Sequence, residues 1–76
     1  MGAVRIVRAY GPGIGSPGRV TISPEPTAEV TYERHAPGRW VAWWRSDYGN
    51  GHGIPQEDAP PELAALLERA WKEAQR

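Results

Sequence analysis

Three of the four tryptophans of this 76-residue chain, Trp40, Trp43 and Trp44, lie within five residues of one another, with arginines on either side. An indole ring offers a flat apolar face, and a guanidinium group can stack on such a face or bind an anion. Alternate side chains of a β-strand point to opposite faces, so Trp40 and Trp44 would share one face and Trp43 would take the other. The segment therefore indicates recognition by stacking, with Trp43 as the accessible ring.

The outward-facing ring would be the centre of a candidate binding site. Its predicted members are Trp43, Arg39 and Arg45 on one strand, and Thr31 and His35 on the strand before it. An exposed indole beside guanidinium groups suits a nucleobase, a sugar ring, or a proline or aromatic side chain of a protein partner. The simpler alternative is a cation–π contact inside the molecule, worth about 0.5 to 1 kcal/mol.

Residues suited to catalysis or metal binding are sparse. The chain has no cysteine and two histidines, which excludes thiolate sites and disfavours a metal centre. Ser46, Asp47 and His52 are close in sequence, but a glycine-rich segment would not hold a catalytic triad in place. The glycines at 11–15 are followed by a second strand, not by a helix, so they match a phosphate-binding loop poorly. We expect a non-enzymatic protein with no catalytic residue, metal or cofactor.

Charge is balanced over the whole chain but not along it. Nine basic and nine acidic side chains give a net charge of zero, which argues against a protein that depends on binding phosphate. Residues 1–45 carry six arginines and three glutamates, net +3, and residues 46–76 carry three basic and six acidic residues, net −3. The basic half could face a nucleic acid or an acidic partner, or the two halves could neutralise each other in the fold.

Hydrophobic alternation predicts four β-strands, at residues 4–10, 19–23, 28–35 and 39–46. In the first of these, Ile6 and Tyr10 share one side, although Arg8 breaks the pattern. Glycine and proline are concentrated in the segments 11–18 and 48–58, which we expect to be flexible loops.

The turn chemistry of residues 36–38, Ala-Pro-Gly, predicts a hairpin between the last two of these strands. A three-residue loop collects the apolar side chains on one face, through the pairs Val30–Trp44, Tyr32–Ala42 and Arg34–Trp40. A two-residue loop would instead pair Tyr32 with Trp43. We favour the three-residue loop because a slip by one residue exchanges the two faces.

The residues after Pro60 and Pro61 predict an amphipathic helix that ends near Ala74. A helix of this kind and a sheet with one apolar face can bury each other. We therefore expect an α+β fold, a small two-layer sandwich in which an antiparallel sheet of three to four strands packs against one C-terminal helix, in the order β-β-β-β-α. The side chains expected to be protected in its interior include Trp40, Trp44 and Trp71.

The length fits a single domain over residues 1–76 with one small core. No apolar run approaches a membrane span and the N-terminus lacks the apolar segment of a secretion signal, so we expect a cytoplasmic protein with no membrane contact. Eight arginines against one lysine, together with eight prolines, are typical of a GC-rich genome or a heat-adapted protein. A homodimer remains open, since pairing would enlarge a small core.

The run Gly38-Arg39-Trp40-Val41-Ala42, followed by a helix, resembles the strand that precedes the helix of HicB-type antitoxins. Its Gly-x-Trp hairpin strand also resembles the sheet-reading arm domain of phage integrases. The resemblance covers a hairpin and a helix, about half the chain. It implies a sheet with one helix, and no functional residue is carried over.

Together these features predict a small non-enzymatic binding or regulatory module that contacts a protein partner through a Trp/Arg sheet face. Tryptophan and arginine are the residues that dominate protein interfaces. The second hypothesis is a nucleic-acid-binding module that uses the basic N-terminal half of the sheet, and a small hydrolase ranks last. Salt separates the first two, because binding to phosphates weakens steeply as salt rises.

Overall fold

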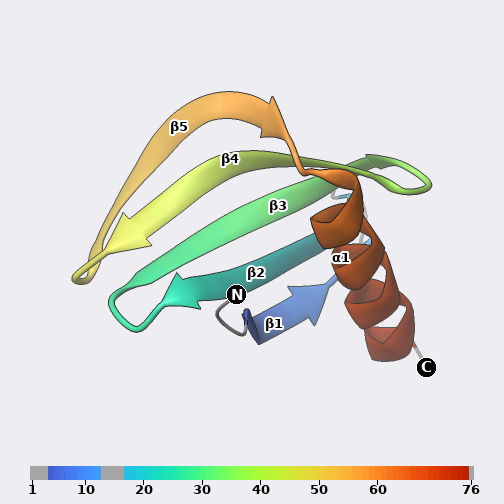
Figure 1. The fold of residues 1–76 in the computed structure, drawn as a ribbon, viewed down its shortest axis with the longest axis horizontal. Helices are drawn as coiled ribbons and strands as arrows, with labels where there is room; N and C mark the ends of the chain where they lie inside the picture. The colour runs from blue at the N-terminus through green and yellow to red at the C-terminus, as the bar shows by residue number, and fades with distance from the viewer. Residues whose placement is uncertain (1–3, 13–16, 76) are drawn as a thin grey trace.

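The computed structural model of the chain describes residues 4–12 and 17–75. The described elements are five strands and one helix, in the order β1 (Arg5–Tyr10), β2 (Arg19–Glu25), β3 (Ala28–Ala36), β4 (Arg39–Asp47), β5 (Asn50–Asp58) and α1 (Pro61–Ala74). Figure 1 shows this arrangement, an antiparallel sheet with a C-terminal helix. The α+β class is confirmed, and the sheet has one strand more than the three to four predicted.

The additional strand is β5, which covers most of the segment 48–58 for which the sequence predicts a loop. It pairs with β4 over nearly the whole length of both strands. The turn between them is Tyr48-Gly49, where both residues have positive φ, 52° and 84°. Glycine and proline suggested a loop because they weaken a central strand, but β5 is an edge strand of the sheet that residues 4–12 and 17–75 form, and edge strands tolerate them.

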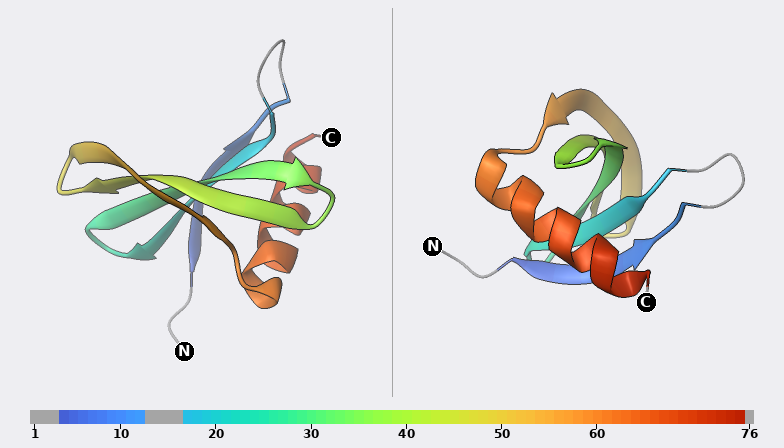
Figure 2. Two further views of the ribbon diagram at one scale, coloured as in Figure 1. Left: turned by 90° about the horizontal axis from the view of Figure 1, so that it is seen from above. Right: turned by 90° about the vertical axis from the view of Figure 1, so that its right-hand side faces the viewer.

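The five strands form a meander in the order β1-β2-β3-β4-β5, and each pairs with its neighbour in the antiparallel sense. The sheet is strongly coiled, so that β5 arcs away from β2 and β3 (Figures 1 and 2). The helix crosses one face of the sheet, which we call the inner face. The side chains of the buried core lie there, namely Val20, Ile22, Val30, Trp40, Ala42, Ala64 and Leu67.

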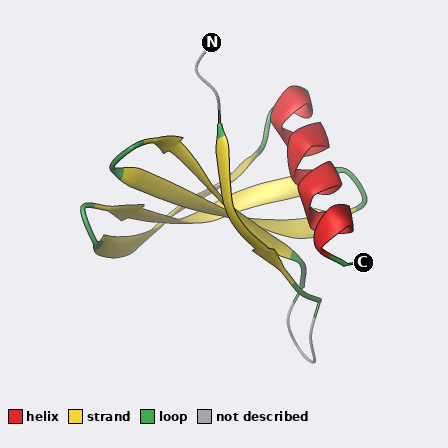
Figure 3. Cartoon of the chain, turned by 90° about the horizontal axis from the view of Figure 1, so that it is seen from below, coloured by secondary structure: helices red, strands yellow, loops and turns green. Residues whose placement is uncertain are grey.

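The helix α1 begins and ends where the sequence predicts. Pro60 and Pro61 stand at its start, where the fixed φ of proline favours the first turn. The acidic Glu62 lies in the first turn and the basic Lys72 in the last, and both charges interact favourably with the helix dipole. Its apolar side chains pack against the core, the nearest strands being β1, β2 and β4. Figure 3 shows the helix beside the sheet. No helix in the described part of the chain is long and apolar enough to cross a membrane.

A shift of register in β1 places two of its side chains on the face opposite α1, which we call the outer face. Val7 is an extra residue between Ile6 and Arg8 in the pairing with β2. Ile6 therefore packs against the core, whereas Arg8 and Tyr10 lie on the outer face. The prediction that Ile6 and Tyr10 share one side is wrong for this reason, since an extra residue reverses the alternation that follows it.

A second shift of register occurs in β4. Two of the predicted pairs with β3 are present, Tyr32–Ala42 and Arg34–Trp40. Beyond them Trp43 is an extra residue, so Thr31, and not Val30, lies opposite Trp44. Trp44 consequently joins Trp43 on the outer face, and the prediction that Trp44 lies in the interior is wrong.

The β3–β4 hairpin has the pairing of the two-residue loop next to its turn and the pairing of the three-residue loop further along. Ala36 pairs with Arg39, which leaves the two-residue turn Pro37-Gly38, where Gly38 has a φ of 77°. His35 is then an extra residue in β3, and it restores the register of the three-residue loop for the residues beyond it. A proline at the first turn position and a glycine at a positive φ suit such a turn.

The predicted loop at 11–18 is described only at its two ends. Gly11, Pro12, Pro17 and Gly18 belong to no strand or helix, and residues 13–16 lie outside the described residues. The loop ends lie against the helix, since the Trp71 indole N–H donates to the Gly11 carbonyl over 3.1 Å. The close approach of Trp71 to Gly18 leaves no room there for a Cβ atom.

Candidate functional site

The outer face carries an open groove of about 330 Å³ that crosses four strands. We call it the outer groove; its lining consists of Arg8, Tyr10, Arg19, Thr31, Trp43 and Trp44. The extra residues, Val7 in β1 and Trp43 in β4, place the side chains at the two ends of the groove on this face. The groove is thus a product of local register shifts and not of simple alternation.

Trp43 lies on the outer face, as the sequence predicts, but its ring is half-buried. The guanidinium carbon of Arg19 stands 4.9 Å from the centroid of this ring, a cation–π contact. The ring of Trp44 lies beside it, with centroids 6.0 Å apart and planes inclined at 53°. The Trp43 indole N–H is shielded from solvent and donates to no acceptor among the described residues. Trp43 can therefore offer a ligand ring surface but no hydrogen bond.

Trp44 is the most accessible tryptophan of the groove, with 39% of its surface exposed. Its ring lies over Gly51 of β5, where an added Cβ would stand 2.6 Å from the ring atom Cζ2. Gly53, two residues along the same strand, has free space, and its nearest neighbour would be the Trp43 carbonyl oxygen at 3.9 Å. Gly51 thus makes room for the Trp44 ring, which explains a glycine within a strand.

The two arginines of the groove are each paired with a glutamate. Arg19 donates from Nε and Nη2 to Glu33 Oε2 over 3.3 and 3.2 Å. His35, at the end of β3, lies with its Nε2 3.3 Å from the other oxygen of Glu33. The Nη2 of Arg8 stands 3.6 Å from Glu29 Oε1. The positive charge of the groove is therefore balanced within the sheet itself.

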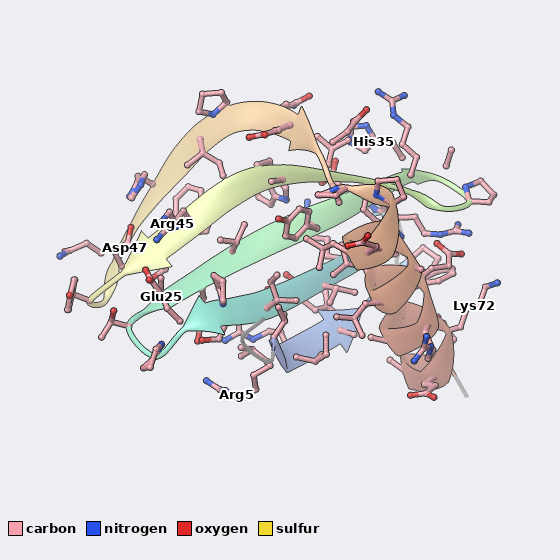
Figure 4. All side chains as sticks on the ribbon, in the orientation of Figure 1. Arg5, Glu25, His35, Arg45, Asp47 and Lys72 are labelled. Atoms are coloured by element: carbon pink, nitrogen blue, oxygen red, sulfur yellow. The ribbon has the colours of Figure 1, made fainter. Side chains whose placement is uncertain are left out.

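Two predicted site residues, Arg39 and Arg45, do not flank Trp43. Arg39 lies near the turn, with its Nε 3.5 Å from Asp58 Oδ1. Arg45 falls on the inner face, because the extra residue at Trp43 reverses the alternation that follows it. Its Nε donates to Asp47 Oδ2 over 2.9 Å, and Figure 4 shows the two side chains together. Neither arginine reaches the ring it was expected to accompany.

Thr31 and Trp43 are the two predicted site residues that the structure brings together in the groove. The Thr31 hydroxyl lies 2.9 Å from that of Thr21, and both side chains are buried. Sequence reasoning missed the other members of the lining, Arg8, Tyr10, Arg19 and Trp44. One signal was present, since the break of alternation at Arg8 is what an extra residue in a strand produces.

Glu68 of α1 is the acceptor of several hydrogen bonds on the inner face. Its carboxylate accepts hydrogen bonds from Arg34 Nη2 at 2.7 Å, from Trp40 Nε1 at 2.9 Å and from the Gly38 amide at 3.1 Å. The hydrogen bond from Arg34 is the largest cause that lowers the pKa of Glu68 to about 2. Burial opposes this effect by raising the pKa, and the Gly38 and Trp40 donors add to the lowering. This network joins α1 to the β3–β4 hairpin.

The groups that could bind metal or carry out catalysis are dispersed. No group of three or more His, Cys, Asp or Glu side chains suited to a metal ion occurs within residues 4–12 and 17–75. The Nε2 of His52 lies 4.0 Å from Asp47 Oδ2, and Asp47 is already the partner of Arg45. The outer groove is the feature of the described chain in which aromatic and charged side chains converge on an open surface.

A comparison with protein-family models finds no match, and comparisons with curated protein sequences and with solved structures find none either. The function of the groove must therefore be argued from its own chemistry.

Proposed function

We propose that this protein is a small non-enzymatic binding module that contacts a protein partner through the outer groove. The observation that carries the proposal is the pair of neighbouring indole rings, Trp43 and Trp44, on an open surface whose arginines are already paired with glutamates. Tryptophan, tyrosine and arginine are the residues most enriched at energetic hot spots of protein interfaces. Arginines held in place by a neighbour lose less side-chain freedom when a partner binds.

Ion pairs along the sheet support a protein partner over a nucleic acid. Arginines of the basic half pair with glutamates of that half and with acidic residues of the other half, in the pairs Arg8–Glu29, Arg19–Glu33, Arg34–Glu68, Arg39–Asp58 and Arg45–Glu25. A phosphate would have to compete with these carboxylates for each guanidinium, so the release of counterions would contribute little to the free energy of binding a nucleic acid. Ring stacking then remains as the main source of affinity.

The experiment is a selection of random dodecapeptides displayed on phage against the immobilised protein, followed by titration of the enriched peptides. The Gly51→Ala variant displaces the Trp44 ring, and Gly53→Ala is the matched control on the same strand. We expect the enriched peptides to bind the natural protein and Gly53→Ala alike, and Gly51→Ala about tenfold more weakly, which corresponds to about 1.4 kcal/mol. Raising the salt from low to moderate concentration should change these affinities little.

Two results would contradict the proposal. One is the absence of any peptide whose binding depends on the Trp44 ring. The other is strong binding of a twenty-nucleotide oligo-dT, with an affinity that decreases steeply as salt rises and is lost in Gly51→Ala. That result would establish the nucleic-acid hypothesis instead. Circular dichroism of both glycine variants shows whether the fold is retained.

Cytoplasmic location and homodimer formation remain predictions from the sequence. Sedimentation of the free protein at high micromolar concentration tests the second, and a monomer would leave the outer groove free for another molecule.

A further inference from the structure

The middle of the outer groove is lined by Thr31 and by the Arg19 side chain, which reaches toward Trp43. The register of β1 to β4 places four outer-face residues in one row, in the order Arg8, Thr21, Thr31 and Trp44. The two threonines in the middle are small, buried and hydrogen-bonded to each other. Tyr10 lies at the β1 end of the groove and Trp43 at its β4 end, with the Thr31 side chain between the two rings.

The length of this row suits a short extended segment. Adjacent strands lie about 4.8 Å apart, so the row from β1 to β4 spans about 14 Å. A polyproline II helix rises 3.1 Å per residue, and about four to five residues would cover that length. The row runs across the strands, so a segment lying along it could not hydrogen-bond to the sheet as an additional strand.

The chemistry of the groove suits proline in particular. A pyrrolidine ring packs on flat aromatic faces, and the polyproline II helix leaves its carbonyl groups free to accept hydrogen bonds. Two donors stand at the β1 end, the hydroxyl of Tyr10, a residue 42% exposed, and the guanidinium of Arg8, whose side chain is 54% exposed. The paired charges of the groove match an uncharged segment better than a phosphorylated or strongly acidic one.

We infer that the outer groove binds an extended, proline-containing segment of a protein partner in the polyproline II conformation, laid across β1 to β4 over Thr31. The inference rests on the proposed function and narrows the partner to one chemical class. Because this conformation is largely formed before binding, little entropy is lost when the segment is ordered. A shallow groove can therefore bind it with a small contact area.

The test uses two-dimensional ¹H–¹⁵N spectra of the full chain, in which the four tryptophans give four indole N–H signals. Trp→Phe variants assign these signals one by one. Titration with decaproline is expected to shift the signals of Trp43 and Trp44 and to leave those of Trp40 and Trp71 in place. The Gly51→Ala variant should bind decaproline about tenfold more weakly, and Gly53→Ala should match the natural protein.

Other outcomes overturn the inference. It fails if decaproline leaves the Trp43 and Trp44 signals unchanged, if it shifts the inner-face signals equally, or if Gly51→Ala binds as well as Gly53→Ala. A glycine-serine decapeptide that binds as well as decaproline would also overturn it, since only the proline rings distinguish the two. If displayed peptides that lack proline bind at the Trp44 ring while decaproline does not, the proposed function stands and the proline inference alone falls.

Discussion

The two faces of the sheet use the same residue type in opposite ways. On the inner face, Trp40 is 1% exposed, its indole N–H donates to Glu68, and its ring meets that of Trp71 edge to face at 6.3 Å. On the outer face, three residues along the same strand, the N–H of Trp43 has no acceptor among the described residues and the Trp44 ring is 39% exposed. One indole is enclosed and hydrogen-bonded, and the other two form a surface.

This contrast separates residues that stabilise the fold from residues available for binding. A buried ring with its polar atom satisfied contributes to stability through both packing and hydrogen bonding. The Trp44 ring is partly in solvent and contributes less to folding than a buried ring, and an exposed aromatic ring beside a second one is common at interaction sites. The enclosed indole thus lies on the inner face, and the more accessible rings lie on the outer face, where we propose the binding site.

The largest expected difference is between Trp40→Ala and Trp44→Ala. Trp40→Ala should lower the free energy of unfolding by about 3 to 5 kcal/mol, because it opens a cavity and leaves Glu68 without one donor. Trp44→Ala should lower it by about 1 kcal/mol or less, since that ring is partly in solvent. Urea unfolding followed by circular dichroism measures both, and equal losses would remove the distinction between the two faces.

The next largest effect is expected for Glu68→Ala, which should lower the free energy of unfolding by about 3 kcal/mol, because the buried Trp40 N–H and the partly buried Arg34 would lose their acceptor. Glu73→Ala on the exposed side of α1 is the matched control and should change the free energy of unfolding by less than about 0.5 kcal/mol. Urea midpoints of the two variants provide the comparison. A Glu68→Ala protein as stable as its control would show that the inner network contributes nothing.

The pH dependence of stability should carry the signature of the same carboxylate. The pKa of Glu68 is lowered from its ordinary value of 4.5 to about 2 in the folded chain, so its contribution is present above about pH 5 and is lost as the pH falls toward 2. The lost contribution amounts to about 3 kcal/mol at most. Urea unfolding of the natural protein and of Glu68→Gln between pH 7 and pH 2 measures it. Their difference should shrink as the pH falls, and parallel curves would contradict the prediction.

The smallest expected effect on stability is that of a substitution at Tyr48, in the turn between β4 and β5. Tyr48 is 81% exposed and has a φ of 52°, a conformation that asparagine adopts more readily than tyrosine. Tyr48→Asn should therefore raise the free energy of unfolding by about 0.5 to 1 kcal/mol. Thermal unfolding measures the gain. Tyr48→Ala removes the ring but keeps the unfavourable φ, so an equal gain in that variant would assign the effect to the ring instead.

Sequence patterns predicted the inner half of the molecule better than the outer half. The structure contains the predicted stripe of α1 and the alternation of Val20, Ile22 and Val30. These apolar side chains could be buried only between the helix and the sheet, so the local pattern was enough to place them. β5 was missed because its glycines and proline mask any alternation, and Gly51 is explained only once the Trp44 ring is seen above it. The paired arginines of the groove, too, become visible only when neighbouring strands are aligned.

The amino-acid sequence by itself determined the α+β class, the terminal helix and the burial of Trp40, because period and apolarity act locally and leave few alternatives. The tertiary structure alone decided which face Trp44, Arg45 and Tyr10 occupy. One extra residue in a strand reverses every side chain beyond it, and whether a strand accepts that residue depends on the partners across the sheet, which the local pattern does not contain.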